Sequence, residues 1–159
     1  MAILAADKII KMNGVNVHQY FLTTHNPNRI DMPGKRTAKN IGVTLHNTDR
    51  ISTAANTTPA EQYTRATVNG NMGTVRVHFY VDDVGAWQNL PIDYTSWHAG
   101  QKGKADAYGS AAGNMQTISI ECIMNGSGDE KDCKARDNAA RLAAYLLDTY
   151  GGDLYTHNY

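Results

Sequence analysis

The chain has 159 residues, a length typical of one domain that can bury its own hydrophobic core. Fifteen Lys and Arg residues balance fifteen Asp and Glu residues, and this zero net charge argues against a nucleic-acid-binding protein. No apolar run approaches the roughly 18 residues that a membrane-spanning helix needs, so we expect no membrane insertion.

The first half of the chain contains one long loop and three regular elements. Residues 22–40 are rich in Gly, Pro, Asn and Lys without apolar periodicity, which predicts a loop. Residues 41–46 form a short apolar run typical of a buried strand. A capping box with proline at the first helical position predicts a helix over 58–68. Residues 73–82 alternate apolar and polar side chains, as a strand does.

The second half repeats this alternation of loops, strands and helices. A second long loop is predicted at 99–116, and a nearly all-apolar strand follows it at 117–124. Apolar residues at helical spacing predict a helix over 132–150, and a short strand follows at 154–157. The sequence therefore predicts an α/β fold in which helices flank a central, mostly mixed β-sheet.

Three polar side chains stand out against these apolar strands. His46 and His157 each end a predicted strand. One such histidine is more often structural than a ligand, but two on neighbouring strands suit a catalytic zinc site, which takes three protein ligands and one water. Glu121 lies within the apolar run 117–124, where an unpaired carboxylate is costly to bury. It is either an outward-facing or ion-paired residue, or else a general base with a raised pKa or an electrostatic anchor beside a metal.

Five short motifs occur in one order along the chain. They are VTLHNT at 43–48, VHFYVDD at 77–83, WHAG at 97–100, TISIECIMNG at 117–126 and YTHNY at 155–159. In this order and spacing the chain resembles the zinc-dependent N-acetylmuramoyl-L-alanine amidases. That family includes phage endolysins and bacterial autolysins and is related to peptidoglycan-recognition proteins. The resemblance covers roughly three-quarters of the chain, from about Ile41 to the end.

The resemblance implies a role for each of five residues. His46 and His157 match the first and second zinc ligands of the family. Glu121 matches an acidic residue that serves as the catalytic base. His98 and Trp97, in the WHAG motif, are implied either to contact the substrate or to support the ligands, with a purely structural role for His98 equally open.

Two positions depart from the family pattern. Members often carry a catalytic tyrosine two residues before the strand phenylalanine, where this chain has Val77, so more of the catalysis falls on the glutamate. The third ligand, a Cys or Asp beyond the second histidine, has no counterpart before Tyr159. Cys122 and Cys133 lie elsewhere in the chain and are expected to be free thiols. We therefore expect 1–159 to be a single catalytic domain, truncated at its C-terminus and without a wall-binding domain.

The expected function is hydrolysis of the amide between N-acetylmuramic acid and L-alanine by zinc-activated water, with the peptidoglycan glycopeptide as partner. The alternative is a non-catalytic peptidoglycan-binding module, because the third zinc ligand is absent from the sequence. The opening residues, MAILAADKIIKMNG, lack a basic leader followed by a sustained apolar core. We therefore expect synthesis in the bacterial cytoplasm without a signal peptide and action on the wall after release.

Overall fold

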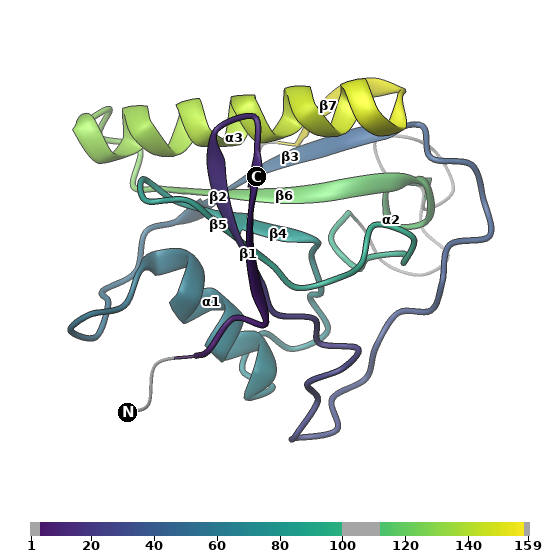
Figure 1. Cartoon of the computed structure of the whole chain (residues 1–159), viewed down its shortest axis with the longest axis horizontal. Coiled ribbons are helices and arrows are strands. Elements are labelled where there is room, and N and C mark those ends of the chain that lie inside the picture. The colour runs from purple at the N-terminus through teal and green to yellow at the C-terminus, as the bar shows by residue number, and fades with distance from the viewer. Residues whose placement is uncertain (1–3, 100–111, 158–159) are drawn as a thin grey trace.

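A seven-stranded sheet forms the centre of the computed structural model, which describes residues 4–99 and 112–157 (Figure 1). The strands are β1 (Lys8–Met12), β2 (Val15–Gln19), β3 (Gly42–Asp49), β4 (Phe79–Val81), β5 (Ala86–Gln88), β6 (Thr117–Met124) and β7 (Asp153–His157). The helices are α1 (Pro59–Val68), α2 (Ala112–Gln116) and α3 (Glu130–Tyr150). None of the described helices is long and apolar enough to cross a membrane.

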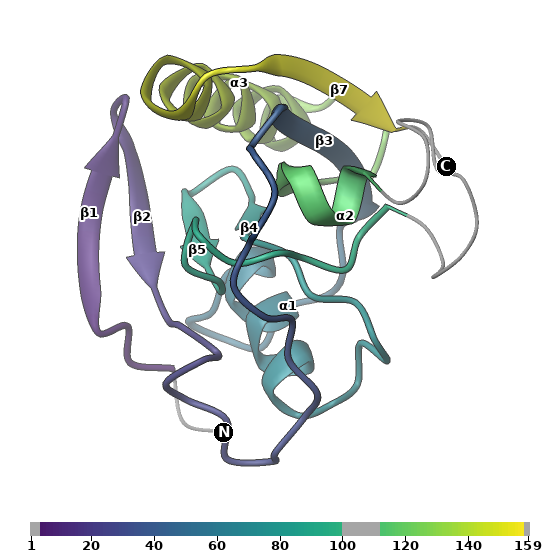
Figure 2. The same cartoon turned by 90° about the vertical axis from the view of Figure 1, so that its right-hand side faces the viewer.

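The order of the strands in the sheet is β1-β2-β5-β4-β6-β3-β7. The four strands β4, β6, β3 and β7 run parallel to one another, while the β1–β2 and β4–β5 pairs are antiparallel. The sheet is therefore mixed, and α3 and α1 cover its opposite faces (Figure 2). The predicted α/β class is confirmed.

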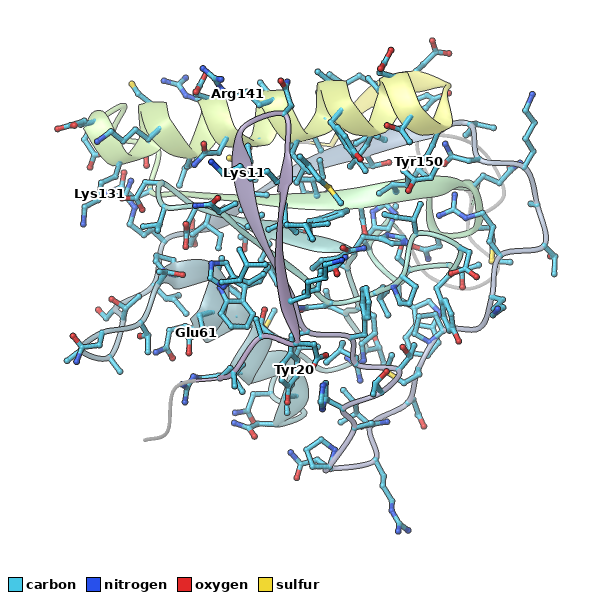
Figure 3. The ribbon with its side chains drawn as sticks, in the orientation of Figure 1. Lys11, Tyr20, Glu61, Lys131, Arg141 and Tyr150 are labelled. Carbon is cyan, nitrogen blue, oxygen red and sulfur yellow. The ribbon has the colours of Figure 1, made fainter. Side chains whose placement is uncertain are left out.

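The long helix α3 builds the larger part of the core. Its buried side chains recur every three or four residues and pack on one face of the sheet: Ala135, Ala139, Leu142, Ala143 and Leu146. The turn of the β1–β2 hairpin reaches the same helix, where the side-chain amide of Asn13 donates to the carbonyl of Arg141 at 3.1 Å (Figure 3).

The helix α1, which is shorter than α3, packs over β4 and β5 on the other face of the sheet. The hydroxyl of Thr58 caps its first turn by accepting the N–H of Glu61 at 3.3 Å, as the capping box predicts. Tyr63 of α1 packs with Tyr80 of β4 and Trp87 of β5. Aromatic side chains therefore cover part of the sheet face that carries Glu121 and His46.

Most predicted elements are present, and apart from the strand predicted at 73–82 their bounds differ by up to three residues. The predicted strand at 73–82 is shorter, because only Phe79–Val81 pair as a strand. His78 interrupts the pairing: its N–H donates to Ser119 Oγ and its Nδ1 accepts the Ser119 N–H, so a side chain replaces the backbone ladder.

Three elements differ from the sequence interpretation. The hairpin β1–β2 and the short strand β5 were not predicted. Part of the predicted loop at 99–116 is the helix α2, and residues 100–111 lie outside the described residues. Both cysteines are free, as predicted, with Cys122 buried and Cys133 exposed.

Candidate active site

One row of register-paired residues carries three of the candidate site positions. Glu121 on β6 pairs with His46 on β3, and His46 pairs with His157 on β7. Because β3 and β6 are parallel, the register-paired Glu121 and His46 belong to the same face of the sheet. The fold thus brings together three positions that are far apart in the sequence, with His46 between the other two.

The same row continues on the other side of Glu121 through two tyrosines. Tyr80 on β4 pairs with Glu121, and its buried ring stacks on Tyr63 of α1 with centroids 5.2 Å apart. The Tyr63 hydroxyl donates to the carbonyl of Asp49 at 2.6 Å. Burial raises the pKa of Tyr63, and the nearby Glu121 carboxylate adds to the rise. Glu121 therefore has an aromatic wall on one side and His46 on the other.

The carboxyl of Glu121 is the most unusual group in this row. Its residue is 8% exposed, and burial raises the carboxyl pKa from 4.5 to about 8. Burial is the only cause of this shift, and none of the ion pairs found among the described residues involves Glu121. A carboxyl with such a pKa can both give and take a proton near neutral pH.

The side chain of His46 contacts that of His98. The Nε2 atom of His46, a fully buried residue, lies 2.6 Å from Nδ1 of His98, and the rings meet edge to face at 4.9 Å between centroids. On its other side, His98 Nε2 lies 3.0 Å from the carbonyl oxygen of Gly113. The chain thus brings His98 of the WHAG motif directly to a candidate ligand.

The loop that carries His98 is held by two groups of contacts. Asn114 Oδ1 accepts the N–H of His98 at 2.7 Å and the N–H of Ala99 at 2.8 Å. The backbone of Trp97 pairs with that of Arg76, whose guanidinium lies 6.0 Å from the centre of the Trp97 ring. Among the described contacts, Trp97 is therefore held by Arg76, while the side chain of His98 contacts His46.

The donor atoms in this region are of the kind that zinc takes. His46 and His98 are imidazoles in buried contact, and the backbone of His157 occupies the next register position. Within the part of the chain that the structure describes, no three His, Cys, Asp or Glu side chains are grouped to hold a metal ion. Imidazole nitrogens of the kind that zinc takes are thus present at His46 and His98.

Sequence reasoning did not find all the residues that shape this region. Tyr80 and Tyr63 carry no sequence signal beyond their positions in a predicted strand and a predicted helix. Asn114 lies in a segment interpreted as a loop, so no periodicity marked it. Each of these side chains acts through a contact between distant segments.

Solved structures share this architecture. The catalytic domain of XlyA has a TM-score of 0.66 and 26% identity, with 90% of this chain and 84% of that chain covered. PlyL has a TM-score of 0.63 and 25% identity, with 87% and 79% covered. PGRP-Hd from Alvinella pompejana, at 14% identity and a TM-score of 0.54, shows the fold alone; it covers 86% of this chain and 84% of that one. The fold is that of amidase catalytic domains and peptidoglycan-recognition proteins.

Sequence comparison narrows this class to one family. The model of the N-acetylmuramoyl-L-alanine amidase family matches residues 36–159, and the chain belongs to that family. Two relatives from Bacillus subtilis (strain 168), the N-acetylmuramoyl-L-alanine amidases CwlH and XlyA, are 33% and 32% identical over 84% of this chain. The chain spans 47% of CwlH and 39% of XlyA, less than half the length of either.

Proposed function

We propose that this chain is a peptidoglycan hydrolase that cleaves the amide between N-acetylmuramic acid and L-alanine. One observation carries the proposal: Glu121, a buried carboxyl with a pKa of about 8, pairs in register with His46 in a chain of the amidase family. General acid–base catalysis works best with a group whose pKa lies near the working pH. Glu121 is such a group.

In this proposal His46 and His157 would hold a zinc ion together with a third ligand. Zinc, when bound, polarises a carbonyl and lowers the pKa of a water ligand to about 7. Glu121 takes the proton of the attacking water and delivers it to the departing alanine nitrogen. The ring of Tyr80 and the body of α1 keep bulk water from one side of Glu121, which maintains its raised pKa.

The WHAG motif supplies the other two proposed site residues. His98 contacts His46 at 2.6 Å, which favours a supporting role over direct substrate contact. Trp97 is half-buried, and its indole is the candidate to stack on a sugar ring of the glycopeptide. The rival function, a binding module without catalysis, is less favoured, because the relatives that match are named amidases.

The test is digestion of purified peptidoglycan with zinc, and with a chelator as the control. Mass spectrometry should detect stem peptides with a free N-terminal alanine only in the zinc reaction. Glu121→Gln should lose turnover while it still binds zinc. Glu130→Gln is the matched control, since Glu130 is an exposed residue that pairs with Lys134 on α3, and it should digest the wall normally. An active Glu121→Gln protein would refute the role of Glu121.

A further inference from the structure

We propose that His98 is a positioning residue that fixes the tautomer of His46, and that Asn114 holds His98 in place for this purpose. In this arrangement His46 Nε2 carries the proton and donates it to His98, so that the lone pair of His46 lies on Nδ1. The inference deepens the proposed function, since it concerns how His46 is prepared to bind a metal ion.

The carbonyl of Gly113 sets the direction of the chain of hydrogen bonds. A carbonyl oxygen only accepts, so the His98 Nε2 atom that lies 3.0 Å from it is the donor; the Thr117 hydroxyl, 3.3 Å from the same nitrogen, gives its own hydrogen to the Gly113 carbonyl at 2.6 Å. Both rings are buried, so their nitrogens have little bulk water to bond to. Neutral His98 then has its lone pair on Nδ1, 2.6 Å from His46 Nε2, and His46 must be the donor.

The opposite tautomer of His46 is disfavoured by the same distance. If Nδ1 carried the proton, two imidazole lone pairs would face each other at 2.6 Å in a site with little water to screen them. The geometry therefore leaves His46 with one favourable neutral tautomer. A metal ion that binds this tautomer meets Nδ1 without first removing a proton.

Two threonine hydroxyls keep the Gly113 carbonyl in position. Thr117 Oγ1 donates to this carbonyl at 2.6 Å, and Thr44 Oγ1 lies 2.7 Å from Thr117 Oγ1. Because Thr117 uses its hydrogen on Gly113, Thr44 donates to Thr117. The carbonyl that orients His98 is thus tied to β3 and β6, the same two strands that carry His46 and Glu121.

Asn114 fixes the backbone on which His98 stands. Its Oδ1 accepts two consecutive N–H groups, those of His98 and Ala99, at 2.7 and 2.8 Å. Its own carbonyl accepts the N–H of Ser96 at 3.1 Å. Asn114 therefore holds the loop through both its side chain and its backbone. Removal of its side chain should allow His98 to move away from His46.

The first experiment reads the tautomers directly. Metal-free protein of the full chain, labelled with ¹⁵N in histidine, gives long-range ¹H–¹⁵N spectra that distinguish the protonated nitrogen of each ring. We expect Nε2–H for both His46 and His98. An Nδ1–H tautomer of His46 in the wild-type protein would overturn the proposal, whatever the protein does to peptidoglycan.

The second experiment measures zinc affinity by competition with a chromogenic chelator. His98→Leu removes the acceptor and should weaken zinc binding about 10- to 100-fold, the range for partners of metal-bound histidines. His98→Asn offers an oxygen near the former Nδ1 and should recover most of the affinity. Asn114→Ala should weaken binding, while Asn114→Asp keeps the accepting oxygen and should bind nearly as well as wild type.

The outcomes separate this inference from the proposed function. If His98→Leu folds and binds zinc as tightly as wild type, the positioning role is wrong even when the wall is digested. If the Leu variant does not fold, the wild-type spectra and the Asn variant still decide. If the tautomers are as expected and peptidoglycan is not cut, the proposed function fails and the hydrogen-bond chain stands.

Discussion

Replacing Glu121 by glutamine should remove a pH-dependent loss of stability from the metal-free protein. Its carboxyl pKa is about 8 in the folded chain and 4.5 when unperturbed. Between these values the folded protein keeps a proton that the unfolded chain has released. The free energy of unfolding that this group supports is complete below pH 4.5, falls as the pH rises, and is lost above about pH 8.

The size of the effect follows from the shift. One pKa unit corresponds to about 1.4 kcal/mol, so the wild type should lose about 4 kcal/mol relative to Glu121→Gln between pH 5 and pH 9. His78 has the opposite sign, because burial lowers its pKa to about 3 and the unfolded chain gains a proton below about pH 6.5. This term is common to both proteins and cancels in the difference.

Urea denaturation at pH 5, 7 and 9 in the presence of a chelator measures this difference. The fluorescence of Trp87 and Trp97 reports unfolding. Glu130→Gln is the control, and its difference from wild type should change little with pH, since Glu130 is exposed on α3. A stability difference between wild type and Glu121→Gln that stays constant from pH 5 to pH 9 would show that Glu121 ionises normally.

Three further substitutions test the packing around the site. Leu142→Ala, in the fully buried face of α3, should lower the urea-derived free energy of unfolding by about 2–5 kcal/mol. Thr58→Ala removes the N-cap of α1 and should cost about 1 kcal/mol in the same assay. Gly42→Ala places a Cβ 1.9 Å from the Asp153 carbonyl of β7, so it should loosen the strand that carries His157 and weaken zinc binding in the chelator competition. Unchanged zinc affinity in a folded Gly42→Ala protein would contradict this use of β7.

Elements with strong local signals were predictable from the sequence. The strand at 117–124 has the predicted bounds because its residues are nearly all apolar and Glu121 is the only charged one. The helix α1 starts where its capping box lies, since Thr58 satisfies an N–H of the first turn. In both cases the information lies within a few neighbouring residues.

Elements that depend on short or irregular pairing were not predictable in this way. β5 has three residues, and its pairing with β2 and β4 gives it a place in the sheet that its length does not reveal. The hairpin β1–β2 did leave a signal, because Asn13 and Gly14 form a two-residue turn with φ values of 49° and 81°. Without that turn, its two strands carry too few apolar residues to be recognised as strands from the sequence.

The candidate site also contains both kinds of feature: a residue with a strong local signal and contacts that depend on distant segments. Glu121 was identifiable because a carboxylate in a buried strand contradicts the local pattern, and such contradictions are expected at functional sites. Its position beside His46 follows from strand register, which no single segment of the sequence contains. The contact of His98 with His46 depends further on Asn114 and Gly113, from a segment with no recognisable pattern. A core that is packed only for stability is not expected to contain a buried carboxyl that lowers stability at alkaline pH. Nor is it expected to contain a fully buried histidine held by a second histidine. Their occurrence in one row of the sheet supports the catalytic role that we propose for Glu121.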